Sequence, residues 1–300
     1  AQPFVDTYLG YAIAFNGCIY NYPELKAELE SKGHQFASTG DTEVILKAWA
    51  EWGPEAVSKL QGMFAFAIHE RQTDRVILVR DRFGIKPLYL AESSGALRFA
   101  STLPALLKSG GIDTSIDRIA LQHYMSWHAV VPAPKTILSG VRKLPPATIR
   151  VIEPDGSFED TVDWRPDYTR SAEDVRRDPE EWTDMLLEAL RTAVRRRMVA
   201  DVPVGVLLSG GVDSSLIVGL LAEQGQEHLA TYSIGFEEAH GEKGDEFKYS
   251  DLIASHYDTN HHKIFIPSEE MRANLPATIR AMSEPMVSYD NVGFFLLSRE

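Results

Sequence analysis

The stretch Val-Leu-Leu-Ser-Gly-Gly-Val-Asp-Ser-Ser, residues 206–215, decides the fold of the C-terminal part of this chain. Its apolar residues predict a buried strand, and the glycines and hydroxyl side chains that follow predict a loop opening a helix. Glycine lets a backbone with positive φ approach an anion closely, and the first turn of a helix presents unpaired N–H groups. The stretch therefore predicts a phosphate site, and an ordinary strand-to-helix turn is the simpler alternative.

The whole loop contributes to the predicted site. Its backbone and hydroxyl donors are expected to come from Ser209, Gly210, Gly211, Val212, Asp213, Ser214 and Ser215. A carboxylate at Asp213 suits an anion site only when a cation lies between it and the phosphates, so we expect Mg²⁺ there. The loop lacks the lysine of the common P-loop and instead resembles the PP-loop of enzymes that cleave ATP to AMP and pyrophosphate.

Helix and strand patterns alternate from residue 179 onward. Apolar residues recur at helical spacing from Trp182 to Met198, and strands are expected at 204–208, 229–234 and 263–266. Such alternation predicts an α/β fold with a doubly wound parallel sheet, in which ligands bind at the carboxyl ends of the strands. We expect Ile234 and Gly235, where the second strand ends, to present backbone to an adenine.

The N-terminal part follows another pattern. Short strands are expected at 11–15, 64–70, 76–81, 88–92 and 96–100, helices are expected to begin at Pro23 and near Asp41, and Asn16-Gly17 has the composition of a turn. Closely spaced strands predict an antiparallel sheet in an α+β sandwich. Prolines are frequent between residues 109 and 178, so we expect domains at 1–108 and 179–300 with 109–178 as the connection.

Composition limits the kinds of partner. The net charge of −13 argues against binding to nucleic acid or an anionic membrane surface, and no apolar run is long enough to span a bilayer. The single cysteine, Cys18, fits a reducing compartment, and we expect a cytoplasmic location. The chain begins without methionine and stops within a predicted helix, so we expect a fragment open at both ends.

Two adjacent histidines, His261 and His262, raise the possibility of a metal site. Adjacent residues of a strand point to opposite faces, so one ion does not easily bind both. We therefore favour structural roles for them.

Two groups of motifs together resemble the asparagine synthetase family. The second half carries residues 201–215, Tyr232-Ser-Ile-Gly-Phe236 and Asp245-Glu246 leading to His261-His262. The first half resembles that family's class II glutaminase domain through residues 15–21, Gly40-Asp-Thr-Glu43, 60–66 and 80–89. Both groups occur in the family's order, and the likeness covers nearly the whole chain. It implies a glutaminase sandwich of the α-β-β-α, N-terminal-nucleophile type before the PP-loop domain.

The resemblance implies specific roles in glutamine hydrolysis. Asn16 through its side-chain amide and Gly17 through its N–H match the oxyanion donors, and Asp41 matches the carboxylate that holds the ammonium of glutamine. Cys18 is interpreted as a packed or substrate-lining thiol. The family's nucleophile is an N-terminal cysteine, whereas residue 1 is Ala1, so we expect this fragment to be inactive alone.

In the second half, the resemblance implies that ATP and Mg²⁺ convert a carboxylate into an acyl-adenylate, which ammonia then attacks. Leu208 and Ile234 match family positions that contact the nucleoside. The implied partners are therefore small molecules: glutamine, ATP and a carboxylate acceptor. A homodimer is compatible with the resemblance.

The acceptor is left open between two carboxylates. Ser101-Thr102, Pro145-Pro146-Ala147, Cys18 and residues 127–134 depart from the asparagine enzymes and resemble the branch that amidates N-acetylglutaminylglutamine, and aspartate is the competing acceptor. Two other functions remain as alternatives. One is an ammonia-fed PP-loop ligase with an inactive glutaminase domain, and the other is a nucleotide-binding protein without turnover.

Overall fold

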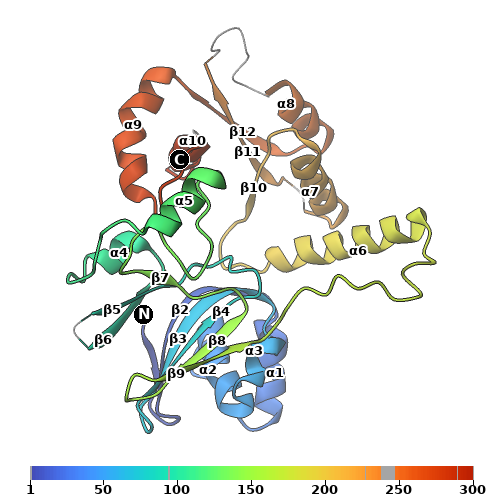
Figure 1. Cartoon of the computed structure of the whole chain (residues 1–300). Coiled ribbons are helices and arrows are strands. Elements are labelled where there is room, and N and C mark those ends of the chain that lie inside the picture. Colours follow the sequence, from blue (N-terminus) through green and yellow to red (C-terminus); the bar gives the residue numbers. More distant parts are fainter. Residues whose placement is uncertain (1, 94, 227, 238–246, 289, 300) are drawn as a thin grey trace. The chain divides into compact units, whose positions relative to one another are not determined.

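A computed structural model describes residues 2–93, 95–226, 228–237, 247–288 and 290–299 (Figure 1). Contacts divide the chain into two units: Ala1–Tyr168 with Met282–Val287, and Thr169–Ala281 with Ser288–Glu300. Ala1 and the pair Asp245-Glu246, which the sequence analysis singled out, lie outside the described residues. Among the described helices, none combines the length and the apolar character that crossing a membrane requires.

The first unit contains two antiparallel sheets. The larger has the order β1-β2-β3-β4-β8-β9 and the smaller the order β6-β5-β7. The larger sheet consists of β1 (Phe4–Asp6), β2 (Tyr11–Ile19), β3 (Gly62–Glu70), β4 (Arg75–Arg80), β8 (Thr148–Ile152) and β9 (Phe158–Val162). The smaller sheet consists of β5 (Tyr89–Ser93), β6 (Ala96–Ala100) and β7 (Arg142–Lys143).

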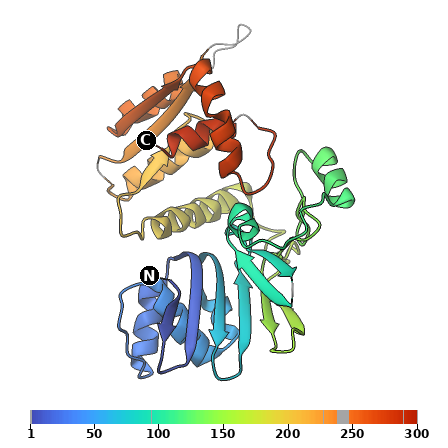
Figure 2. The same ribbon diagram turned by 90° about the vertical axis from the view of Figure 1, so that its left-hand side faces the viewer.

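The layers of this unit pack against one another through three apolar cores. Helices α1 (Tyr22–Ser31), α2 (Asp41–Trp52) and α3 (Glu55–Lys59) pack on one face of the larger sheet (Figure 2). A second core, with Leu78 from the larger sheet and Leu90 from the smaller, lies between the sheets, and a third joins the smaller sheet to α4 (Leu103–Leu107). The predicted α-β-β-α sandwich is therefore confirmed. Helix α5 (Arg118–Ser126) belongs to the same unit.

The structure differs from the sequence analysis in two places in this unit. Asn16-Gly17, expected as a turn, lies inside β2, because this strand pairs with β3 along its whole length. Residues 109–178, expected as a connection, contain β8 and β9, which complete the larger sheet. Ile149 of β8 is buried in the core beneath α1–α3, so burial of apolar side chains overrides the linker composition.

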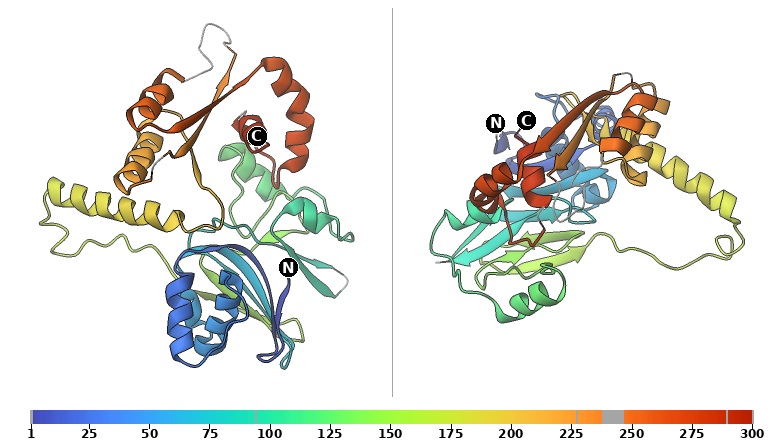
Figure 3. Two further views of the ribbon diagram at one scale, coloured as in Figure 1. Left: turned by 180° about the vertical axis from the view of Figure 1, so that it is seen from behind. Right: turned by 90° about the horizontal axis from the view of Figure 1, so that it is seen from above.

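The second unit is built on three parallel strands in the order β10-β11-β12. They are β10 (Gly205–Leu207), β11 (Ala230–Phe236) and β12 (Asn260–Ile266). One core packs α6 (Pro179–Arg197), α7 (Val212–Glu223) and α8 (Phe247–His256) with Leu208 and Leu229. Another core packs α9 (Ser268–Ala281) and α10 (Asp290–Leu297) with the ends of β11 and β12, and α7 with α8 lies across the sheet from α9 with α10 (Figure 3). The predicted doubly wound α/β arrangement is confirmed.

Candidate functional site

The residues predicted to bind glutamine lie in the second half of β2. Asn16, Gly17 and Cys18 face Ala65, Phe64 and Met63 of β3, respectively, across the antiparallel ladder. The first residues of this strand pair with both β1 and β3, whereas Asn16, Gly17 and Cys18 are held in the ladder by β3. A donor on such a strand is held more rigidly than one in a turn, which suits an oxyanion site.

Gly17 is required by the closeness of β3. A Cβ at this position would lie 2.2 Å from the Met63 carbonyl oxygen and 2.8 Å from the Phe64 Cα. Gly62 has the same constraint from the other strand, because a Cβ there would lie 2.1 Å from the Cys18 carbonyl oxygen. The two glycines let β2 and β3 approach closely beside the predicted oxyanion donors.

Asp41 is brought to the end of the same strand. It is the first residue of α2, whose N-cap is Gly40, and its carboxylate accepts a hydrogen bond of 3.0 Å from the N–H of Ile19. The helix thus begins at Asp41 itself, and the N-cap position is occupied by the preceding Gly40. The carboxylate connects α2 to the strand that carries Asn16 and Gly17, which places an anion beside the predicted glutamine pocket.

Glu43, in the same motif, has a structural role. It is 2% exposed and accepts hydrogen bonds from the N–H groups of Ala37 and Ser38, with Lys47 Nζ at 3.6 Å. Burial acts to raise the pKa of Glu43, but these hydrogen bonds and the charge of Lys47 outweigh it and hold the pKa below its ordinary value. Glu43 thereby fixes the loop that precedes Asp41.

The motif at residues 80–89 is likewise structural. The carboxylate of buried Asp81 accepts from the N–H groups of Phe64, Phe83, Ile85 and Lys86. The Arg80 guanidinium donates to three carbonyls of the surrounding chain, including that of Leu144 at 2.6 Å. Opposite charges thus satisfy the donors and the acceptors of one buried loop, which explains the motif without a catalytic role.

The predicted phosphate loop follows β10 and leads into α7. Gly210 has φ of +82°, and a Cβ there would lie 2.5 Å from the Tyr249 Cβ of α8, so both the conformation and the contact require glycine. Gly211 is the N-cap of α7 with φ of −70°. The expectation of positive φ is therefore right for Gly210 and wrong for Gly211, because one left-handed residue suffices to turn the chain.

The hydroxyl groups of the loop are not equivalent. The Ser209 and Ser214 hydroxyl oxygens lie 3.1 Å apart, and the Gly211 N–H donates to Ser209 at 3.3 Å. The Ser215 hydroxyl is buried and has no hydrogen-bond partner among the described residues, and Ser215 lines a cavity of about 530 Å³ with residues of α6. The Ser209 and Ser214 hydroxyls are thus paired with each other in an exposed hydrogen bond, whereas Ser215 lines the cavity next to α6.

The remaining predicted residues surround the loop. Leu208 is 1% exposed and precedes Ser209, and Asp213 is exposed in the first turn of α7. Ile234 and Gly235 lie on β11, next to β10 in the sheet. Among the described residues, no group of three or more His, Cys, Asp or Glu side chains is arranged to hold a metal ion by itself.

The side chains of His261 and His262 make contacts on different sides of β12. The His261 ring lies 2.8 Å from the Thr231 hydroxyl, whereas His262 stacks on Tyr232 with the rings 4.9 Å apart. They point to opposite faces of β12, as the strand periodicity predicts. A further residue that was not predicted from the sequence is Ser233, whose hydroxyl donates to the Leu208 carbonyl. Its only signal was the pair of polar residues, Thr231 and Ser233, on the buried face of β11.

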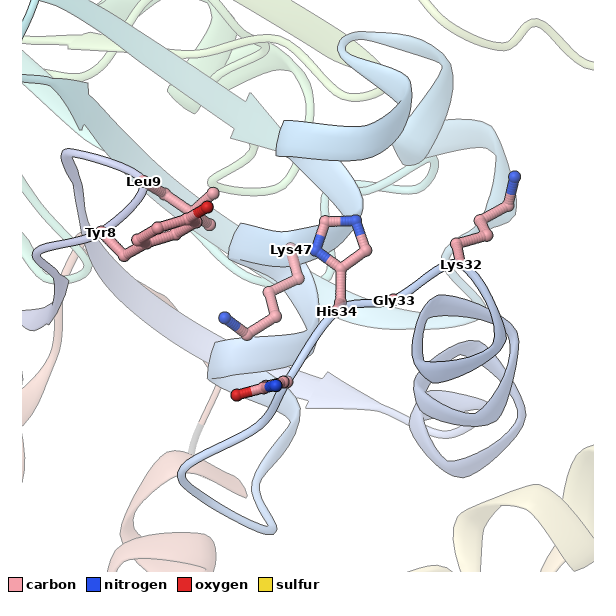
Figure 4. Close-up of a pocket in the computed structure, with 7 residues that line it drawn as sticks. Tyr8, Leu9, Lys32, Gly33, His34 and Lys47 are labelled. Carbon is pink, nitrogen blue, oxygen red and sulfur yellow. The ribbon is translucent and has the colours of Figure 1, made fainter.

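A separate hollow of about 680 Å³ lies on the first unit (Figure 4). Its basic side chains have acidic partners: Lys32 and the His34 ring contact Glu51, and Lys47 pairs with Asp6 at 2.8 Å. None of the predicted site residues lines it. The hollow therefore offers little uncompensated charge to a ligand.

Two family models match the chain in succession. The model described as a glutamine amidotransferase domain matches residues 1–162, and the model described as asparagine synthase matches residues 185–300.

Curated relatives extend the likeness over both units. The chain is 36% identical over 290 residues to asparagine synthetase [glutamine-hydrolyzing] 1 of Bacillus subtilis, which covers 97% of this chain and 44% of the relative. It is 32% identical over 286 residues to asparagine synthetase B of Escherichia coli, covering 90% of this chain and 44% of the relative. The chain thus spans less than half the length of these relatives. A solved glutamine phosphoribosylpyrophosphate amidotransferase of Bacillus subtilis aligns with a TM-score of 0.41 at 15% identity, covering 90% of this chain and 74% of that one.

Proposed function

Because this chain belongs to the asparagine synthetase family, with a glutamine amidotransferase domain followed by an asparagine synthase domain, we propose that it serves in glutamine-dependent amidation of a carboxylate. Glutamine would supply ammonia, and ATP would activate the acceptor as an acyl-adenylate with release of pyrophosphate. The observation that carries the proposal is the stretch of residues 209–215, in which a serine after a parallel strand pairs with a serine in the first turn of the following helix.

The first unit would bind and polarise glutamine. The Asn16 amide and the Gly17 N–H would donate to the oxyanion of the tetrahedral intermediate, where fixed donors lower the barrier most. The Asp41 carboxylate would pair with the α-ammonium of glutamine. The pairing of β2 with β3 and the bond from Ile19 to Asp41 support these roles, because they hold donors and carboxylate in one place. Cys18, beside Gly17, would line the substrate.

The second unit would bind the nucleotide. Ser209, Ser214 and the N–H groups of Gly211, Val212 and Asp213 would bind the pyrophosphate portion of ATP. The nucleoside would contact Leu208, Ile234 and Gly235. Ser215 would support α7 from the helix layer rather than donate to phosphate, since its hydroxyl is buried.

The donor set fits a magnesium ion held jointly with phosphate. Mg²⁺ is commonly bound by one or two carboxylates together with substrate phosphates, and Asp213 supplies one exposed carboxylate in the first turn of α7. When bound, the ion would neutralise charge on the departing pyrophosphate. The protein's own part is to place Asp213 and the serine hydroxyls on one loop.

The acceptor is proposed to be N-acetylglutaminylglutamine, with aspartate as the competitor. The support is the set of departures from the asparagine enzymes, among them Cys18 and Ala147. The test is a panel of carboxylates given to the intact protein with glutamine, Mg²⁺ and ATP, with AMP formation as readout. The preferred acceptor should give the highest ratio of kcat to KM, and equal rates with and without any acceptor would contradict an amidating enzyme.

A pair of variants separates the proposal from the ammonia-fed alternative. Asp41→Asn and Asn16→Ala should lose glutamine-dependent amidation and retain the rate with ammonium chloride as donor, because both residues act only on glutamine. Ala12→Ser is a matched control at the other end of the same strand and should retain most of the glutamine-dependent rate. An intact protein that works equally well with ammonium but never with glutamine would establish the alternative.

A further inference from the structure

A buried polar network lies beneath the phosphate loop and contacts it at one residue, Leu208. The Leu208 N–H donates to the Tyr232 carbonyl at 2.7 Å, and the Leu208 carbonyl accepts from the Ser233 hydroxyl. Ser233 is 5% exposed. Both backbone groups of the residue that precedes Ser209 are therefore held by β11.

The direction in which the Leu208 carbonyl points determines whether the loop presents an N–H donor or a carbonyl oxygen to a bound anion. The peptide between Leu208 and Ser209 is planar and trans, so its C=O and N–H point in opposite directions. Because the carbonyl points to Ser233, the N–H of Ser209 points away from β11. Release of the carbonyl would let this peptide turn and present an oxygen where an anion needs a donor.

His261 continues the network below Ser233. Its Nε2 lies 3.4 Å from the Ser233 Oγ, and its Nδ1 lies 2.8 Å from the Thr231 Oγ1, which is itself 2.8 Å from the Thr259 Oγ1. Ser233 uses its only proton for the Leu208 carbonyl, so its oxygen accepts from His261. This assigns the proton of the neutral ring to Nε2, and Nδ1 then accepts from Thr231. With the protons placed in this way, the Ser233 and Thr231 hydroxyls and both ring nitrogens of His261 each have a hydrogen-bond partner.

Helix α8 lies close both to the phosphate loop and to His261. Tyr249 and Ser250 lie against Gly210, and the next residue, Asp251, lies 3.7 Å from the His261 Nε2 and 3.0 Å from the Lys263 Nζ. The charged and titratable groups that act on His261 electrostatically are Asp251 from α8, Lys263 from the same strand and, from the opposite face of that strand, His262. Loop, strand and helix meet at the two residues Ser233 and His261.

We propose that Ser233 and His261 are positioning residues for the phosphate loop: Ser233 holds the Leu208 carbonyl away from the bound diphosphate, and His261 orients the Ser233 hydroxyl. The inference rests on the proposed function, because it assigns the support of the same nucleotide site. Neither residue touches the nucleotide.

The test compares two ligands on the intact protein, magnesium pyrophosphate and adenosine, by calorimetry or by competition. Ser233→Ala should weaken binding of magnesium pyrophosphate about fivefold, the size expected for one lost hydrogen bond. Binding of adenosine should change less than about twofold, because adenosine makes no contact with the loop's donors. His261→Phe should have the same selective effect, and Ser233→Thr should restore pyrophosphate binding because it retains the hydroxyl.

His262→Gln is the matched control, since it alters the adjacent histidine of the same strand on the opposite face. It should bind both ligands like the wild type, and thermal unfolding should show that every variant is folded at the assay temperature. If Ser233→Ala binds pyrophosphate as tightly as the wild type, or loses both ligands equally, the positioning role is refuted. If the wild type itself binds no magnesium pyrophosphate, the phosphate site fails and the inference fails with it, which distinguishes the two outcomes.

Discussion

At the scale of single residues, the two opposed glycines of β2 and β3 show how strictly local geometry limits substitution. A Cβ on Gly62 would lie within 3.1 Å of the carbonyl oxygen and carbon of Cys18 and the Cα of Ile19, all of them backbone atoms. These atoms belong to the paired ends of β2 and β3, and they cannot move away without disrupting that end of the ladder. Gly62 therefore protects the position of the predicted oxyanion donors without touching substrate.

We predict that Gly62→Ala lowers the free energy of unfolding of the first unit by about 3 kcal/mol, the upper range for overpacking. Gly40→Ala is the control, because a Cβ there meets nothing within 4 Å and should cost less than about 1 kcal/mol. Urea denaturation of both variants measures the difference. Equal stability of Gly62→Ala and the wild type would contradict the close strand approach.

Because the pKa of His261 is lowered in the folded state, the free energy of unfolding of the second unit depends on pH in a defined direction. Burial lowers this pKa below 6.5, and the negative charge of Asp251 opposes the shift only in part. Well above pH 6.5 the ring is neutral in both the folded and the unfolded state, so its full contribution to stability is present. As the pH falls below 6.5 the unfolded chain takes up the proton first, and the free energy of unfolding decreases until the pH passes the lower pKa of the folded state.

We predict that His261→Gln makes the loss of stability between pH 7 and pH 5 shallower than in the wild type. Chemical denaturation at a series of pH values measures the two slopes, and His262→Gln should follow the wild type. A wild-type protein whose free energy of unfolding rises on acidification in this range would show the sign to be wrong.

At the scale of elements, the strands and helices were largely predictable from hydrophobic periodicity. The expected helix at 182–198 and the parallel strands before and after α7 are found with shifted ends, because strongly periodic segments bury one face in any fold. The end of β2 was not predictable, because Asn16-Gly17 favours a turn locally and only pairing with the distant β3 keeps it extended. The strands β8 and β9 were missed because prolines around them resemble a linker.

Only the part of the candidate site that lies within a single sequence motif was predictable. Residues 209–215 form a single loop and could be recognised together. The contact of Asp41 with Ile19 and the network from Ser233 to His261 depend on which strands become neighbours, and a sequence does not state the register. Single-sequence periodicity also could not show that Ser215 lines a cavity together with residues of α6.

The segment Met282–Val287 joins the first unit although it follows α9 of the second. Its Glu284 accepts hydrogen bonds from Lys143 Nζ at 2.9 Å and from the Tyr89 hydroxyl at 2.9 Å. Burial, together with the negative charge of Glu284, raises the pKa of Tyr89, so the phenol keeps its proton and remains a donor. An ion pair that is mostly buried therefore anchors this segment beside β5 and β7.

We predict that Lys143→Met lowers the free energy of unfolding of the first unit by about 3 kcal/mol, because it leaves the Glu284 carboxylate buried without a cation. The double variant Lys143→Met with Glu284→Gln should recover much of that loss, since no buried charge is then unpaired. A double-mutant cycle by urea denaturation measures the coupling. Additive losses would show that the pair does not interact.

At the scale of the whole molecule, the chain joins two units whose predicted chemistries are complementary. One carries the predicted oxyanion donors and a carboxylate proposed to bind glutamine, and the other carries the predicted diphosphate loop after a strand of a parallel sheet. Neither unit alone accounts for amidation, because ammonia needs an activated acceptor and the acceptor needs a nucleophile. The proposed amidation requires the second unit to direct cleavage of ATP between the α- and β-phosphates.

The products formed from ATP provide the most direct measurement. The intact protein, supplied with glutamine, Mg²⁺, ATP and the preferred carboxylate, should form AMP and pyrophosphate in equal amounts, with one glutamate per amide. Ser209→Ala should reduce both nucleotide products together. Formation of ADP and orthophosphate in place of AMP and pyrophosphate would contradict a loop that binds the departing diphosphate.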